Sequence, residues 1–347
     1  MRKFDYKKFV AAEWNSAIVS GIGQIHEYKG RQAVYLQQKP HELTRLIEFA
    51  KIQSTESSNK IEGVLTTSTR IRQLLAEKTS PRNRDENEIL GYRDVLNTIH
   101  ENYEYIPVRP SFILQLHRDL YKYSLSSTGG KFKNVQNYIN AKSPDGNEFV
   151  LFTPLAPFET PQAIESICFN YNQLAGTGKL DDLILSAIFI CDFLCVHPFL
   201  DGNGRMSRLI TLLLLYRSGY QIGKYISLEK IIEQTKDSYY DALRKISQDW
   251  HTETNDYRPF IEYLLKIILH AYRELDERIE LVSGNLPAYE MVKTVVEKIL
   301  GSFSKQDILE RCPSIGSSSV EIALKKLKDE QVIKSIGAGR NTRYVRR

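Results

Sequence analysis

Two long apolar runs, at residues 183–196 and 209–216, are separated by one short polar segment at residues 197–208. Apolar runs of this kind predict buried helices. The segment between them contains Gly202 and Gly204 on either side of an asparagine, and glycines placed in this way predict a tight turn that opens the second helix. Any fold of this chain must therefore bury two neighbouring helices and place a polar turn between them.

The polar turn has the features of an anion-binding site. The first N–H groups of a helix have no partner within the helix, and the helix dipole adds positive potential there. Arg205 and Arg208 would project from one side of the first turn, which predicts a polyphosphate ligand. A phosphate would repel Asp201 unless a divalent cation lay between them, so we interpret Asp201 as a magnesium ligand. His197 ends the preceding helix and is the candidate general base.

The complete segment resembles the signature of the Fic family, His-x-Phe-x-Asp-Gly-Asn-Gly-Arg-x-x-Arg, at every fixed position. The resemblance implies a mainly α-helical catalytic core that transfers AMP from ATP to a hydroxyl of a target protein. Gly204 favours AMP transfer, because the phosphate-transferring branch of the family carries a lysine at the matching place. ATP contacts are expected for the signature residues Asp201, Gly202, Asn203, Gly204, Arg205, Met206, Ser207 and Arg208.

A second motif lies before the core. Ser58, Glu62 and Gly63 match the family's inhibitory pattern Ser/Thr-x-x-x-Glu-Gly/Asn, and the resemblance pairs Glu62 with Arg208. A carboxylate bound to a guanidinium occupies the donors that the terminal phosphate of ATP would need. The resemblance therefore implies an auto-inhibited enzyme. Without it, the same residues would simply end a helix, and Glu62 would be a solvated charge.

A β-hairpin is predicted within this otherwise helical chain. Strand-like residues at 132–139 and 149–152 flank a Pro-Asp-Gly-Asn turn at 144–147. An isolated hairpin is marginally stable and must pack against something. In the family the corresponding hairpin is a flap that pairs with the backbone of the target protein; a plain surface hairpin is the alternative. The residues expected to dock the target are Tyr138, Ile139 and Asn140, although the Gly-Gly found after the strand in many relatives is missing.

The nucleoside end of the site rests on the resemblance alone. Tyr239 and Tyr240 fall in a helix expected to begin after residue 227, where an aromatic pair by itself would indicate core packing. The family places such a pair against the nucleotide. Ser247 takes the place at which several relatives carry an amide side chain that binds the base. The resemblance therefore adds these three side chains to the predicted ATP site.

The composition is that of a water-soluble globular protein of more than one domain. The chain has 347 residues, a net charge of +5 and four cysteines in apolar contexts, which we interpret as reduced core residues of a cytoplasmic protein. Neither a signal peptide nor a membrane-length apolar run is predicted. The expected domains are residues 1–85 with the inhibitory segment, a catalytic core at 86–281 and a third domain at 285–347; only short or irregular elements are expected at 1–40.

The third domain has the pattern of a winged helix, with three helices followed by two strands that enclose a Gly-rich wing. Its final residues contain five cations and no acid, which favours contact with DNA, but winged helices also dock proteins. Those cations are Lys334, Arg340, Arg343, Arg346 and Arg347. A homodimer is left open.

Two classes of alternative function remain. The same site could transfer phosphate or UMP, or reverse AMP transfer, because the signature selects a diphosphate more strongly than a base. The chain could also be a winged-helix DNA-binding regulator with a degenerate enzyme core, but the intact signature argues against degeneracy.

Overall fold

The computed structural model describes residues 2–38, 40–76, 79–124, 128–142, 145–283, 286–299, 301–312, 315–337, 339 and 342–347. The chain divides into two compact units, one made of residues 1–32 and 50–271 and the other of residues 33–49 and 272–347. The expected domain limits at 1–85, 86–281 and 285–347 stay predictions. Each unit is described by itself below.

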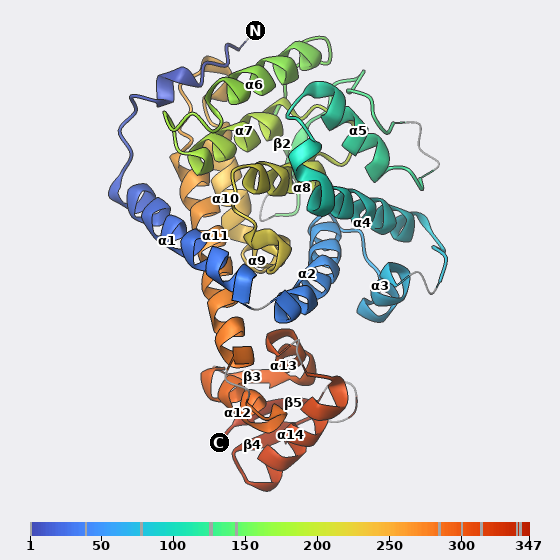
Figure 1. Ribbon diagram of the computed structural model, residues 1–347. Coiled ribbons are helices and arrows are strands. Elements are labelled where there is room, and N and C mark those ends of the chain that lie inside the picture. Colours follow the sequence, from blue (N-terminus) through green and yellow to red (C-terminus); the bar gives the residue numbers. More distant parts are fainter. Residues whose placement is uncertain are drawn as a thin grey trace. The chain divides into compact units, whose positions relative to one another are not determined.

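The first unit is mainly α-helical, as predicted. The helix α7 (Asp182–Val196) lies at its centre, and every residue from Leu183 to Val196 is buried. It packs against α6 (Thr160–Leu174), α8 (Asn203–Arg217) and α10 (Lys236–Ser247), as Figure 1 shows. The remaining helices with residues in this unit are η1 (Lys7–Phe9), α1 (Ser16–Gln38), α2 (Pro40–Ile61), α3 (Ser68–Leu75), α4 (Arg84–Asn102), η2 (Tyr103–Tyr105), α5 (Pro110–Leu120), η3 (Ile222–Lys224), α9 (Leu228–Gln234), η4 (Trp250–Thr252) and α11 (Arg258–Ser283).

The predicted hairpin is present in the first unit. Strand β1 (Ile139–Lys142) pairs antiparallel with β2 (Glu148–Phe152), and Ala141 lies opposite Phe149. Phe152 is buried and makes an edge contact with Trp250, with ring centroids 6.0 Å apart. Pro144 of the expected turn lies outside the described residues. The hairpin is therefore packed at its base, while Val150 on β2 remains about half exposed.

Two expectations about helices were wrong. Residues 16–38 form the long helix α1, not short or irregular elements, because Ile18 and Ile25 are buried on one face and the glycines that suggested breaks are accommodated within the helix. The single helix expected after residue 227 is divided into α9 and α10 at Thr235. The Thr235 hydroxyl bonds to the Ile231 carbonyl oxygen and lies 2.9 Å from the hydroxyl of Tyr263, which fixes the corner.

The second unit contains three more helices and a small sheet. Its elements are α12 (Ala288–Lys298), β3 (Ser302–Ser304), α13 (Lys305–Arg311), α14 (Ser317–Asp329), β4 (Ile333–Ile336) and β5 (Arg343–Arg346). The strands form an antiparallel sheet in the order β3-β5-β4, in which β3 was not predicted. Val292, Ile308 and Leu327 lie in its apolar core. The classification as a winged helix stays a prediction, and Arg340 of the wing lies outside the described residues.

The buried cysteines and the helix lengths complete the description. Cys168, Cys191, Cys195 and Cys312 are buried free thiols, as expected for reduced core residues. Among the residues with described coordinates, no helix combines the length and the apolar character needed to cross a membrane.

Candidate functional site

One pocket of the first unit collects residues from four separate segments, and its volume is about 680 Å³. It lies where the end of α7, the start of α8 and the end of α2 meet the hairpin and α10. Apolar side chains form its hairpin end, and charged groups form the end at α8. The lining residues that were predicted as site residues are Glu62, Tyr138, Ile139, His197, Gly204, Arg208, Tyr239, Tyr240 and Ser247.

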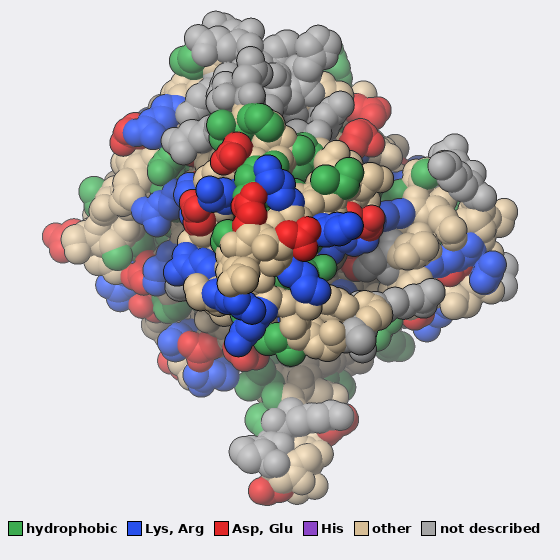
Figure 2. Space-filling model, turned by 90° about the horizontal axis from the view of Figure 1, so that it is seen from below, with side chains coloured by type: hydrophobic (Ala, Val, Ile, Leu, Met, Phe, Trp, Pro, Cys, Tyr) green, Lys and Arg blue, Asp and Glu red, His purple; other side chains and the backbone are tan. Residues whose placement is uncertain are grey.

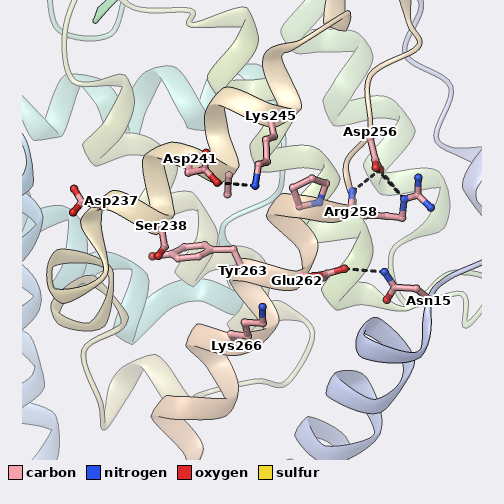
Figure 3. Close-up of a pocket in the computed structure, with 12 residues that line it drawn as sticks. Asn15, Asp237, Ser238, Asp241, Lys245, Asp256, Arg258, Glu262, Tyr263 and Lys266 are labelled. Carbon is pink, nitrogen blue, oxygen red and sulfur yellow. Dashed lines mark hydrogen bonds and ion pairs between the residues drawn. The ribbon is translucent and has the colours of Figure 1, made fainter. Parts of the chain in front are cut away.

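A second pocket, of about 650 Å³, lies beside α10 and the start of α11 and is drawn in Figure 3. Its charged side chains are largely paired with one another. Asn15 donates to Glu262 over 2.8 Å, Asp256 accepts from Arg258, and Lys245 binds Asp241. Because these groups satisfy each other, the first pocket is the stronger candidate for a functional site.

His197 closes α7 in a left-handed conformation, with φ of 50°. Its Nδ1 lies 3.2 Å from the carbonyl oxygen of Leu194. A carbonyl oxygen can only accept, so Nδ1 carries the proton and Nε2 carries the free lone pair. Burial lowers the pKa of the imidazole to about 4, which keeps it neutral near pH 7. The side chain therefore has the protonation state of a general base.

The loop between His197 and α8 is fixed from within by Asn203. The Asn203 side chain accepts from the backbone N–H of Phe199 over 2.9 Å and donates to the carbonyl oxygen of Phe199 over 2.7 Å. Asn203 is 3% exposed. The Asn203 amide therefore holds the turn closed, and Asn203 does not line the pocket.

Two residues before the hairpin, which sequence reasoning missed, support the same loop from outside. Lys133 is buried and donates from Nζ to the Val196 carbonyl oxygen over 3.0 Å and to Asn137 over 2.9 Å. Asn137 in turn donates to the carbonyl oxygens of His197 and Phe199. Burial lowers the pKa of Lys133 to about 8. A lysine and an asparagine four residues apart would have been the only sequence signal.

His117 supports the loop through its ring. It stacks on Phe199 with a centroid separation of 3.6 Å, and its Nδ1 accepts from the N–H of Gly130. Nε2 therefore carries the proton and donates to the carbonyl oxygen of Asp201 over 3.1 Å. Burial lowers the pKa of His117 to about 4. His117 thus has a structural role, the positioning of the turn.

Arg208 and Glu62 are paired, and the pairing includes Ser58. The Arg208 guanidinium donates to Glu62 Oε1 over 2.8 Å, to the Ser58 hydroxyl over 2.8 Å and to the Ser58 carbonyl oxygen over 2.9 Å. The Glu62 carboxylate lies against the start of α8, where a Cβ on Gly204 would fall 2.2 Å from Oε1. Because a helix N-terminus attracts anions, Glu62 occupies a position suited to a phosphate.

Arg205 has a different environment from Arg208. Its guanidinium is 2% exposed and donates to Glu88 over 2.6 Å and to the hydroxyl of Tyr121 over 2.9 Å. It does not line the pocket. The predicted contact of Arg205 with ATP stays a prediction, and the observed contacts assign it to the support of α8 against α4 and α5.

Asp201 is the expected magnesium ligand. Its side chain is 52% exposed, with Oδ1 accepting from the N–H of Gly202 and Oδ2 lying 3.3 Å from Arg84. Mg²⁺ is commonly held by one or two carboxylates together with substrate phosphates, so an exposed carboxylate of this kind fits the ion. The described residues contain no group of three or more potential metal-ligating side chains.

The predicted site residues thus fall into two sets. Those in the pocket are given above, with Tyr239 buried beside Arg208 and Tyr240 45% exposed. Ser247 donates its hydroxyl to the Arg244 carbonyl oxygen over 2.9 Å, so only its lone pairs remain for a base. The described residues that were predicted for the site but do not line this pocket are Ser58, Gly63, Asn140, Asp201, Gly202, Asn203, Arg205, Met206 and Ser207.

Comparison with known proteins supports the signature. Residues 107–215 match the model of the Fic/DOC family. The chain is 27% identical over 186 residues to protein adenylyltransferase fic-1 of Caenorhabditis briggsae, covering 53% of this chain and 32% of that protein. It is 27% identical over 252 residues to protein adenylyltransferase Fic of Drosophila erecta, covering 69% of this chain and 46% of that protein. The chain therefore spans between about a third and a half of the length of these curated relatives.

Solved structures give the same fold. A Fic family protein from Desulfovibrio desulfuricans aligns with a TM-score of 0.63 at 20% identity, covering 97% of each chain. A Fic domain containing signaling protein from Bacteroides thetaiotaomicron aligns with a TM-score of 0.60 at 24% identity, covering 75% of this chain and 95% of that one.

Proposed function

Because residues 107–215 form a domain of the Fic/DOC family, we propose that this protein transfers AMP from ATP to a Ser, Thr or Tyr hydroxyl of a target protein. The observation that carries the proposal is the pocket that brings a neutral His197 to the same space as Gly204 and Arg208. A base beside a phosphate-binding helix terminus suits attack of a hydroxyl on phosphorus. The curated relatives bear the name protein adenylyltransferase.

The reaction follows from the chemistry of these residues. ATP binds with its phosphates at the start of α8, where Arg208 neutralises charge on the terminal phosphate. His197 Nε2 takes the proton of the target hydroxyl as its oxygen attacks the α-phosphorus, and pyrophosphate leaves from the opposite side. Mg²⁺ on Asp201 would neutralise phosphate charge when bound. The exposed edge of β1 offers backbone groups for pairing with a target segment.

Auto-inhibition is part of the same proposal. With Arg208 bonded to Glu62 and Ser58, the Nε and Nη2 donors of its guanidinium are already used and are not available to the terminal phosphate of ATP. A phosphate and the Glu62 carboxylate would also compete for the start of α8. Release of Glu62 would therefore restore productive binding of the triphosphate.

Mass spectrometry of purified protein incubated with ATP tests the proposal. We expect Glu62→Gly to gain mass equal to AMP on its own hydroxyl side chains well above the wild type, because Arg208 becomes available. His197→Ala in the Glu62→Gly background should abolish the gain. Parallel incubation with UTP distinguishes UMP transfer from AMP transfer, and a mass gain equal to one phosphate group would indicate phosphate transfer. No modification of Glu62→Gly by ATP would refute AMP transfer.

Contact of the second unit with DNA stays a prediction. Lys325, Lys328 and Lys334 are exposed and have no side-chain partner among the described residues. The first two line a groove of about 450 Å³ together with Glu321. On the face shown in Figure 2, Lys and Arg side chains are interspersed with Asp and Glu. Titration with duplex DNA at several salt concentrations would test it, because phosphate contacts give binding that weakens steeply with salt. Cytoplasmic location and homodimer formation also stay predictions.

A further inference from the structure

The last two turns of α2, which carry Ser58 and lead to Glu62, are attached to α9 through one carboxylate. Glu233 accepts from the Ser57 hydroxyl over 2.8 Å and binds Lys60 Nζ over 2.5 Å. Lys230, one turn earlier on α9, also reaches Glu233 over 3.2 Å. The Glu233 side chain is 14% exposed, so these are partly buried contacts between two helices that are distant in sequence. Ser57, Lys60, Lys230 and Glu233 do not line the pocket.

A second contact fixes the peptide that precedes the inhibitory glutamate. Lys236 Nζ, at the start of α10, donates to the carbonyl oxygen of Ile61 over 3.0 Å. That carbonyl belongs to the peptide bond between Ile61 and Glu62. The last carbonyls of a helix have no partner within the helix, so Lys236 supplies the one that α2 lacks at this point. The backbone orientation that aims Glu62 at Arg208 is therefore set from α10.

We propose that Glu233 and Lys236 are positioning residues that hold Glu62 on Arg208, so that breaking either contact activates the enzyme without changing any residue that binds nucleotide. The inference rests on the proposed function. Helix termini open more readily than helix interiors. Without Glu233 or Lys236, the final turn of α2 would keep the packing of its buried residues and the Arg208 contacts, for which ATP competes, but would lose a charged attachment outside the pocket.

Matched substitutions test the proposal on the full chain. Glu233→Gln removes the charge but keeps the size, and Lys236→Met keeps the aliphatic stem. Each should raise self-modification by ATP about tenfold, the change expected from loss of one charge-assisted hydrogen bond. Glu262→Gln and Lys266→Met make the same changes elsewhere in the first unit, outside the ATP pocket, and should leave the rate at the wild-type level.

Measurements in the Glu62→Gly background show whether Glu233 and Lys236 act by positioning Glu62 or by a general effect on the structure of the enzyme. If Glu233 and Lys236 act through Glu62, then neither substitution should raise the rate of Glu62→Gly further. Hydrogen exchange should also show faster exchange of the backbone amides of residues 58–64 in Glu233→Gln than in Glu262→Gln. Wild-type rates in both Glu233→Gln and Lys236→Met, alongside an active Glu62→Gly, would overturn the positioning role. An inactive Glu62→Gly would instead refute the proposed function.

Discussion

The loop from His197 to Asn203 and the end of α2 lie at the same pocket but are held in different ways. The loop is supported by buried groups, among them Asn203 and Lys133, each 3% exposed. The end of α2 is held on one side by the buried Arg208, which binds Ser58, and on the other by charged contacts with Glu233, in which Lys60 is 54% exposed. Buried hydrogen bonds are costly to break, whereas exposed ion pairs contribute little. The difference indicates a catalytic loop that stays in place and an inhibitory segment that can be released.

The largest change in stability should come from removing Glu88, which binds Arg205 at the start of α8, directly after the loop. Both side chains are 2% exposed, so Glu88→Ala leaves a buried guanidinium without its carboxylate. We expect the free energy of unfolding to fall by about 3–5 kcal/mol, measured by denaturant titration. The double variant Glu88→Leu/Arg205→Met should recover much of this loss. If the free energy of unfolding of Glu88→Ala fell by less than about 1 kcal/mol, the start of α8 would be held no more firmly than the end of α2.

Loss of the internal support of the loop should be the next largest effect. Asn203→Ala removes both hydrogen bonds to Phe199 and leaves the buried N–H of Phe199 unpaired, whereas the Phe199 carbonyl oxygen keeps the hydrogen bond from Asn137. The expected loss is about 2–3 kcal/mol in the free energy of unfolding. Asn102→Ala is the control, because Asn102 is exposed and makes one long hydrogen bond on α4. Equal losses in the two variants would remove the distinction between buried and exposed contacts.

The pH dependence of stability gives a further test of the loop. Burial lowers the pKa of His117 and of His197 to about 4, below the usual value near 6.5. Between these values the unfolded chain binds more protons, so each histidine makes stability fall as the pH falls from about 6.5 to 4. One such group should cost about 2 kcal/mol at pH 5 relative to pH 7.

His197→Ala removes one of these groups and should lose correspondingly less stability between pH 7 and pH 5 than the wild type. Unfolding titrations at the two pH values measure it. An unchanged difference would show that His197 titrates normally and has no buried neutral form.

The two regions also differ in what their sequences reveal. The signature predicted the turn and the candidate general base His197, because glycine, asparagine and histidine at fixed spacing leave few other arrangements. Glu62 was predicted to pair with Arg208 through the resemblance, and the structure contains that contact. Lys133 and Glu233 were missed because isolated charged residues are usually solvated. Their partners are backbone carbonyls or distant helices, which no local pattern encodes.

Arg205 shows a related limit of local patterns. Its spacing from Arg208 indicates that both project from the first turn of α8, but not which tertiary neighbour each meets. Glu88 comes from α4, which packs against α8, and Tyr121 directly follows α5, which packs against α4. The roles of the two arginines therefore separate only when the helices are assembled.

The smallest effect on stability should occur at Lys60, where we nevertheless expect activity to change. Lys60→Met removes an ion pair that is 54% exposed on the lysine side, so the free energy of unfolding should change by less than about 1 kcal/mol. Self-modification by ATP should still rise about two- to fivefold, because Glu233 keeps only its Ser57 and Lys230 contacts and α2 opens more often. Lys51→Met, earlier on the same helix, is the control and should show no rise. The free energy of the Lys60–Glu233 ion pair is small compared with that of global unfolding, but it acts directly on the equilibrium between bound and released Glu62. A self-modification rate in Lys60→Met equal to that of the wild type would show that Lys236 and Ser57, rather than this exposed ion pair, hold the end of α2.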